Sequence, residues 1–154
     1  MKKTFLLLLA AAMWVFAGAT TIPTFPDRVF NIKDYYNGKD TIYTAAINNA
    51  IIDCSKQGGG KVLIPKGEYL TGPIQLKSNV HLHMEDGVVL RFSTDPRLYE
   101  PIVLTRIEGA DCYNLSPLIY AYGQENIAIT GKALLDGQAT AANWLDPHNM
   151  YYHL

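Results

Sequence analysis

Apolar residues recur along this chain with two different periods. Between residues 42 and 56 they return every three or four positions, the spacing that places side chains on one face of an α-helix. The members of this face are Ile42, Ala46, Ile47, Ala50, Ile51 and Cys54. Asp40 or Thr41 precedes them and can cap the first turn, so we predict a helix from there through Lys56. Residues 29–36 (VFNIKDYY) alternate with a period of two instead, and predict a short strand before the helix.

After Lys56 the pattern changes to short apolar runs separated by glycine and proline. Three consecutive glycines at 58–60 end the helix, because glycine adopts the left-handed conformation that closes a last helical turn. A phosphate-binding loop would need Lys-Ser or Lys-Thr opening a helix, whereas Lys61-Val62 opens a strand. The predicted strands are residues 62–64, 69–71, 74–76, 80–84 and 88–92. Pro65-Lys66-Gly67 suits a type I turn between the first two.

Two later stretches resemble each other. Residues 79–90 (NVHLHMEDGVVL) and 126–137 (NIAITGKALLDG) share an asparagine, an apolar alternation, a glycine turn and a second apolar run. Such an echo is typical of parallel solenoids. Residues 93–122 break the rhythm with three prolines and four tyrosines, and we interpret them as a long loop of the kind that often carries a binding site.

One helix followed by coils of short strands is typical of a right-handed parallel β-helix. We therefore predict an all-β fold whose N-terminal helix covers the first coil and its unpaired strand edges. The predicted divisions are a first strand and capping helix in 20–60, coils in 61–144 with the long loop at 93–122, and an atypical tail in 145–154.

Residues 1–19 have the pattern of an export signal. Lys2 and Lys3 precede an apolar run at 5–16, and Ala17-Gly18-Ala19 matches the small residues of a cleavage site. The run is short for a membrane span. We expect a signal peptide, a mature chain beginning near Thr20, and a periplasmic, extracellular or cell-surface location.

Charge and cysteine content narrow the classes of partner. The sequence holds 13 basic and 14 acidic residues, and loss of the two leader lysines leaves 11 against 14, a formal charge of −3. This mild acidity disfavours nucleic acid or an anionic membrane as partner. Cys54 and Cys112 are too few for a disulfide framework. We favour two free, buried thiols, with a bridge between them as the alternative in an oxidising compartment.

Residues 46–96 and 103–138 resemble glycoside hydrolase family 28, the polygalacturonase family of pectin-degrading enzymes. The second stretch is the more specific, since Arg-Ile-Glu-Gly at 106–109, Pro-Leu-Ile-Tyr-Ala at 117–121 and Asp-Gly-Gln at 136–138 resemble an exported bacterial branch. The resemblance extends from about Asp34 to Trp144. It implies a substrate of pectin type, an acidic polysaccharide, with no cofactor and a monomeric protein if the chain is complete.

The resemblance also implies a reaction, the hydrolysis of α-1,4 links between galacturonate units with inversion. An inverting enzyme holds an acid and a base roughly 6.5–9.5 Å apart, with water between them. In this family those groups belong to Asn-Thr-Asp and Asp-Asp motifs, supported by Gly-His-Gly and Arg-x-Lys. None of these motifs occurs in the sequence, so no catalytic residue is assigned. We predict an N-terminal fragment of a longer enzyme, inactive by itself.

Several polar clusters have simple structural explanations. His81 and His83 share one strand face, but zinc needs at least three protein ligands, so we interpret them as solvent-facing or as hydrogen-bonded between coils, and predict no metal. Glu85 and Asp86 are neighbours whose side chains diverge, which suits a solvated turn better than an acid and base pair. Asp136-Gly137 likewise has turn chemistry.

The candidate substrate-binding residues lie in the predicted loop: Arg106, Glu108, Tyr113 and Tyr120, with Tyr122 beside them. An arginine fork binds a uronate carboxylate through two nitrogens, and tyrosine rings stack on sugar rings. The structural alternative is that Arg106 pairs with Glu108 or Glu100 to hold the loop while the tyrosines pack the coil.

Three hypotheses about function therefore compete. The first is the N-terminal part of an exported polygalacturonase-type hydrolase. The second is a non-catalytic β-helix module that binds carbohydrate, and the third is an unstable remnant without function. Galacturonate release, retention on pectin and resistance to proteolysis separate them.

Overall fold

The structure, a computed structural model, describes residues 22–140. The predicted export signal at 1–19, Trp144 and the predicted tail at 145–154 lie outside the described residues. None of the helices within the described part is long and apolar enough to cross a membrane.

The described chain runs through short elements in three successive turns. β1 (Val29–Asn31), the 3-10 helix η2 (Ile32–Tyr35) and α2 (Thr44–Lys56) precede these turns. The first turn comprises β2 (Gly60–Ile64), β3 (Gly67–Thr71) and β4 (Ile74–Gln75). The second comprises β5 (Val80–Met84), β6 (Val88–Phe92), the 3-10 helix η3 (Pro96–Tyr99), β7 (Val103–Ile107), β8 (Ala110–Asn114) and β9 (Ile119–Tyr120). The third comprises β10 (Ala128–Gly131) and β11 (Leu134–Asp136).

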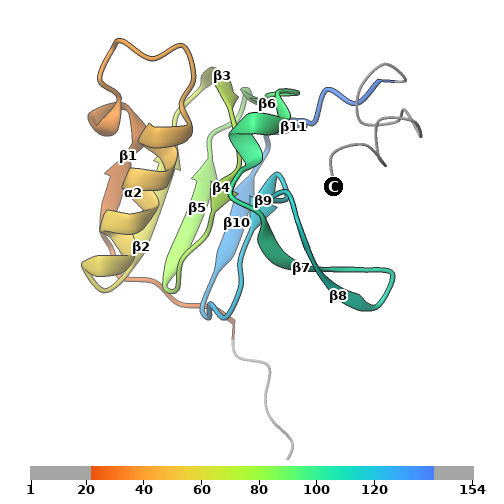
Figure 1. Ribbon diagram of the computed structural model, residues 1–154. Helices are drawn as coiled ribbons and strands as arrows, with labels where there is room; N and C mark the ends of the chain where they lie inside the picture. Colours follow the sequence, from red (N-terminus) through yellow and green to blue (C-terminus); the bar gives the residue numbers. More distant parts are fainter. Residues whose placement is uncertain (1–21, 141–154) are drawn as a thin grey trace, which may run out of the picture.

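Equivalent strands of these turns stack in parallel. One sheet has the order β1-β2-β5-β10, a second β11-β6-β3, and a third pairs β4 with β9. Register is kept across the stack, so that Val62 pairs with Leu82 and Leu82 with Ile129. The predicted parallel β-helix is confirmed, with α2 against one side of the stack (Figure 1).

The interior of the coils is apolar because every second strand residue points inward. In β2 and β5 the first, third and fifth residues are buried, and in β6 Val88, Leu90 and Phe92 are. The residues of the stack interior that are entirely inaccessible to solvent are the apolar Val62, Ile64, Ile74, Val80, Leu82 and Leu90, together with Thr71.

The sequence echo corresponds to two stacked coils. His81 pairs with Ala128, and Val89 pairs with Leu134, so the repeated stretches lie directly on one another. Asn79 and Asn126 both have left-handed backbone, with φ of 65° and 53°, and Nδ2 of Asn126 donates to Oδ1 of Asn79 at 2.9 Å. The shared asparagine therefore forms the corner before each strand.

Helix α2 covers the first coil, as predicted. Its buried residues are Ala46, Ile47, Ala50, Ile51 and Cys54, the members of the predicted face other than Ile42. Its polar side also bonds to the coil edge, since Nδ2 of Asn48 donates to the Pro73 carbonyl at 3.0 Å and Oδ1 of Asn48 accepts from the Gln75 amide at 2.9 Å. The helix thus satisfies backbone groups that an open coil would expose.

The predicted start of the helix is wrong by a few residues. The helix begins at Thr44, and Ile42 lies before it, half-buried. Thr44 Oγ1 accepts a 2.6 Å hydrogen bond from the Gly72 amide, and Asp40 instead accepts a bond from the Asn37 side chain within the preceding loop. The predicted strand at 29–36 is also too long, because Asn31 Oδ1 accepts from the Lys33 amide and caps η2.

The end of α2 follows the prediction. Gly58 donates to the Ser55 carbonyl and Gly59 to the Cys54 carbonyl, the two bonds of a glycine-terminated helix. Gly58 is left-handed, with φ of 88°. Gly59 has φ of 99°, and a Cβ there would lie 2.6 Å from the Asn79 carbonyl oxygen. The triplet therefore combines a helix stop with the tight corner before β2.

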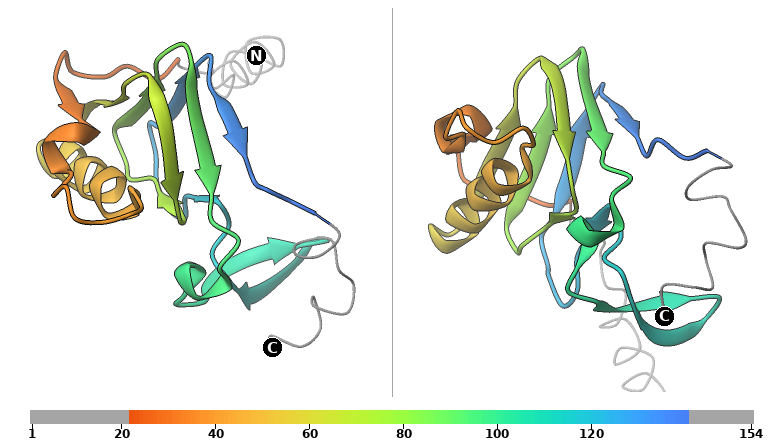
Figure 2. Two further views of the ribbon diagram at one scale, coloured as in Figure 1. Left: turned by 90° about the horizontal axis from the view of Figure 1, so that it is seen from above. Right: turned by 45° about the horizontal axis from the view of Figure 1, so that its top comes forward.

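The segment predicted as a long loop contains secondary structure of its own. β7 and β8 form an antiparallel hairpin, and β9 returns the chain to the stack beside β4. Glu108 and Gly109 connect the two hairpin strands with φ of 51° and 89°, the positive values that a tight two-residue turn requires. Figure 2 shows the hairpin projecting from the coils.

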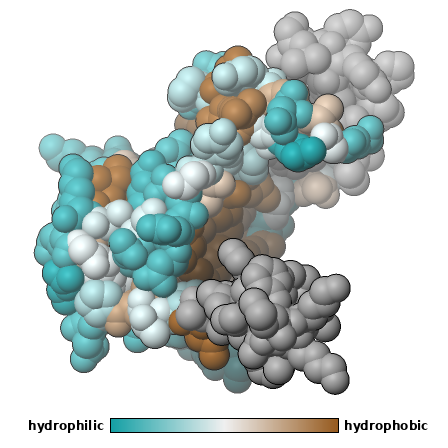
Figure 3. Space-filling model, turned by 90° about the horizontal axis from the view of Figure 1, so that it is seen from below, coloured by the Kyte–Doolittle hydropathy of each residue, from teal (hydrophilic) through white to brown (hydrophobic). Residues whose placement is uncertain are grey.

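The third turn is less covered than the first two. Ile129 and Leu135 pair with the buried Leu82 and Leu90, yet they are 43% and 44% exposed. The view from below in Figure 3 shows a hollowed hydrophobic surface in the middle of this face of the molecule.

Candidate substrate-binding site

The projecting hairpin carries the predicted arginine at its outer end. Arg106 lies on β7 directly opposite Asp111 on β8, and its side chain is 70% exposed. Its Nε donates to the Gly109 carbonyl at 3.1 Å, and one terminal nitrogen lies 3.8 Å from the Asp111 carboxylate. The alternative pairing with Glu108 or Glu100 is therefore not what the structure shows. The bond to Gly109 orients the guanidinium and leaves most of its surface in solvent.

Tyr113 lies on the same face of the hairpin as Arg106. It pairs with Leu104, two residues from Arg106 along β7, and side chains two apart on a strand share a face. Tyr113 is 65% exposed, and Glu108 forms the adjoining turn. A cation and an aromatic ring are thus presented on one face at diagonal positions, with the Asp111 carboxylate opposite the cation, and this combination can contact a charged sugar polymer.

Tyr120 is placed differently from the other candidates. It lies in β9, half-buried and paired with Gln75 of the stack, and its hydroxyl donates to the Leu104 carbonyl at 2.8 Å. This bond ties the base of the hairpin to the coils. Tyr122, just after β9, is 62% exposed. The structure therefore places Arg106 and Tyr113 on one face of the hairpin and Glu108 in its turn, and makes Tyr120 an anchor for the hairpin.

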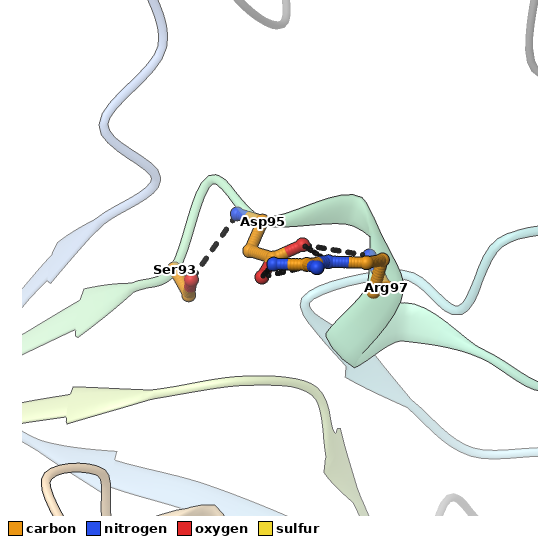
Figure 4. Close-up of polar contacts among 3 residues, drawn as sticks. All are labelled: Ser93, Asp95 and Arg97. Atoms are coloured by element: carbon orange, nitrogen blue, oxygen red, sulfur yellow. Dashed lines mark hydrogen bonds and ion pairs between the residues drawn. The ribbon is translucent and has the colours of Figure 1, made fainter.

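The turn that leads out of the stack is fixed by three polar residues (Figure 4). Ser93 Oγ accepts from the Asp95 amide at 3.1 Å, and Asp95 Oδ1 accepts from both the Arg97 amide at 3.1 Å and its Nε at 2.9 Å. The second Asp95 oxygen lies 2.7 Å from a terminal nitrogen of Arg97. These bonds to Arg97 hold the pKa of Asp95 below its ordinary value, so this carboxylate is a structural acceptor and not a proton donor.

His81 and His83 form hydrogen bonds to the neighbouring coil, which is one of the two predicted alternatives. Nε2 of His81 and Nδ1 of His83 both lie 2.7 Å from Oγ1 of Thr130 on β10. Thr130 is not among the residues predicted from the sequence, although its place opposite His83 follows from aligning residues 79–90 with 126–137. Among residues 22–140 no group of three or more metal-ligating side chains comes together.

Neighbouring carboxylates at the β5–β6 turn have different partners. Glu85 Oε2 accepts from the Lys66 amide at 2.9 Å, whereas Asp86 lies 3.9 Å from Lys132 Nζ. Because the two side chains diverge, they cannot act as an acid and base on one bond. The predicted turn role of this pair is confirmed.

The buried thiol and phenol are unreactive. Burial raises the pKa of Cys54 to about 11 and that of Tyr99 to about 12. Neither group is ionised near neutral pH, so neither is a nucleophile there. Both cysteines are free; Cys54 is buried as predicted, whereas Cys112 on β8 is only half-buried, because the hairpin stands outside the core.

Comparisons with known proteins assign this architecture to a class. No protein-family model matches the chain. An exopolygalacturonase structure from Thermotoga maritima has 46% sequence identity and a TM-score of 0.73, over 80% of this chain and 28% of that one. A family 28 exopolygalacturonase from Yersinia enterocolitica has 30% identity and a TM-score of 0.60, over 72% of this chain and 21% of that one. The molecule is therefore a right-handed parallel β-helix of the pectinase kind.

A curated relative is similar over most of this chain. The exo-poly-alpha-D-galacturonosidase of Dickeya chrysanthemi is 31% identical over 127 residues, which is 77% of this chain and 21% of that protein. The chain spans 15% and 21% of the length of the curated relatives it matches. The predicted resemblance to glycoside hydrolase family 28 is confirmed, and the chain corresponds in sequence and fold to part of such a protein.

Proposed function

We propose that this chain is the N-terminal part of an exported polygalacturonase-type protein and that its projecting hairpin binds a pectin-type acidic polysaccharide. The observation that supports the proposal best is the exposed guanidinium of Arg106, oriented by the Gly109 carbonyl and adjoined by Tyr113 on one hairpin face. Galacturonate units carry a carboxylate on every ring, and a guanidinium recognises a carboxylate through paired N–H groups.

The similar proteins support the same substrate class. The names of the Thermotoga, Yersinia and Dickeya proteins place galacturonate polymers among their substrates. The formal charge of −1 for the whole chain gives no general attraction to a polyanion, so a local cation has to provide it. Arg106 lies on β7 of the hairpin, which projects from the coils (Figure 2).

Retention on immobilised polygalacturonate tests the proposal. Arg106→Ala should lower the affinity of the purified chain for the polymer at least about tenfold, since a charge-assisted contact contributes about 1.5–3 kcal/mol. Tyr113→Ala should lower it by a smaller factor. Lys39→Ala is the matched control, because it removes the same charge from the exposed loop before α2. Equal retention of Arg106→Ala and Lys39→Ala would refute the hairpin site.

We further propose that the 154-residue chain does not hydrolyse the polymer. The reason is the absence of the family's acid and base motifs from its sequence. Release of reducing ends from polygalacturonate by the purified chain would disprove this. A non-catalytic carbohydrate-binding module is the second candidate, favoured by the projecting hairpin, and it predicts retention without hydrolysis in the native secreted protein.

Export is a proposal that rests on residues 1–19. Expression of the full chain with N-terminal sequencing of the secreted product should give a start near Thr20. A product that keeps Met1 and stays inside the cell would contradict it. Rapid proteolysis of the purified chain at room temperature would instead favour the hypothesis of an unstable remnant.

A further inference from the structure

Residues 22–28 cross the stack before β1 and contact each of its three turns. We call this segment the strap. In Figure 1 it runs along the bottom of the coils. The Arg28 carbonyl accepts from the Lys61 amide of β2 at 2.8 Å, the Phe25 ring stacks on His81 of β5 at 5.1 Å, and the Thr24 carbonyl accepts from Asn126 at 3.0 Å. The last bond joins residues 102 positions apart.

The central contact of the strap rests on the histidine pair. His81 and His83 are half-buried, with ring centroids 5.7 Å apart, and both bond to the Thr130 hydroxyl. A hydroxyl has one proton, so with neutral rings one nitrogen accepts that proton while the other donates to Oγ1. When both rings are protonated, both donate, and the hydroxyl proton loses its acceptor.

The groups facing the pair add to the positive charge. On β2, Lys61 pairs with His81 and Leu63 with His83; on β10, Ala128 and Thr130 are the partners; the strap supplies Phe25. Further along, Asp86 is held near Lys132 at the β5–β6 turn. Protonated imidazoles beside a lysine repel one another, and this repulsion opposes the attraction of an imidazolium for the Phe25 ring.

From this arrangement we infer that docking of the strap depends on pH. The strap is docked across the three coils at neutral pH and is released from them as the solution is acidified. The direction agrees with the surroundings of His81. Burial is the largest cause that lowers the pKa of His81, followed by His83 and Lys61. The stacked Phe25 ring contributes to that burial, so His81 binds a proton less readily with the strap docked than with the strap released. Docking is therefore strongest above the ordinary pKa of about 6.5 and weakens as the pH falls below it.

Hydrogen exchange in the full chain tests the inference. The Lys61 amide, which bonds to the Arg28 carbonyl, should lose about tenfold in protection between pH 7.5 and pH 5.0 after correction for intrinsic exchange. The Leu82 amide inside the stack is the reference and should not change. The double variant His81→Gln, His83→Gln should keep its Lys61 protection at both pH values, and Phe25→Ala should lack it at both.

Two results would overturn the inference. One is a Lys61 amide whose protection stays constant or rises on acidification, as it would if the imidazolium–Phe25 attraction dominated. The other is an undiminished pH effect in the double histidine variant. If that variant does not fold, NMR titration of His81 in the Phe25→Ala variant replaces it. Loss of the Phe25 ring should raise the pKa of His81 toward its ordinary value. An unchanged pKa would show that the strap does not affect the protonation of His81 and would overturn the inference.

Discussion

The coil stack and the hairpin are both built from short strands, but they differ in how many strand residues are buried. In β5 three of five residues are buried, whereas in β7 and β8 none is. The stack strands β2, β5 and β6 have a strand on both sides, while the hairpin pairs only with itself and is attached through Tyr120. We therefore expect the stack to supply most of the folding free energy of the described chain. The exposed hairpin can present charged and aromatic side chains to a ligand.

The largest expected effect contrasts one apolar residue from each region. Leu82→Ala removes a side chain that is fully buried between β2 and β10, and should lower the free energy of unfolding by about 2–5 kcal/mol. Ile107→Ala, at a hairpin position that is 48% exposed, should cost less than about 1 kcal/mol. Urea unfolding of both variants measures the difference. Similar losses would show that the hairpin belongs to the cooperative core.

The elements that the sequence predicts correctly are those in which the local hydrophobic pattern agrees with the burial in the structure. The five buried residues of α2 and the alternation of β5 were predictable because each reflects a single period facing a single core. The helix start was not, since Thr44 is engaged by the Gly72 amide, 28 positions away, and the Asp40 side chain bonds within its own loop. A distant backbone group decided which residue begins the helix, and no local pattern reports it.

The hairpin was missed although a signal for it exists. Residues 103–107 and 110–114 flank a Glu-Gly pair, and two strands separated by two residues ending in glycine indicate a tight hairpin. The signal is weaker than Asn-Gly, because Glu108 must adopt φ of 51° without the local hydrogen bonds of asparagine. The candidate residues were found from their chemistry, but only the structure separates Arg106 and Tyr113 at the surface from Tyr120 at the base.

A pair of glycines sharpens the comparison between the two regions. Gly59 and Gly109 have similar backbone, with φ of 99° and 89°, but a Cβ at Gly59 would lie 2.6 Å from the Asn79 carbonyl oxygen and one at Gly109 would contact nothing within 4 Å. Gly109→Ala should cost about 1 kcal/mol for the left-handed backbone alone. Gly59→Ala adds a clash inside the stack and should cost about 2 kcal/mol or more. Equal unfolding midpoints would contradict the tight corner.

The smallest expected effect concerns two arginines. Arg91 lies 3.0 Å from Glu68 and 3.7 Å from Asp136, so it joins the three strands of one sheet on their outer face. Because these groups are largely exposed, Arg91→Ala should cost only about 0.5 kcal/mol, and less in high salt. Arg106→Ala, with its nearest carboxylate oxygen at 3.8 Å, should leave unfolding unchanged while lowering retention on polygalacturonate. A destabilisation by Arg106→Ala as large as that of Arg91→Ala would mean that the hairpin arginine holds structure, and the proposed division between scaffold and binding surface would then be lost.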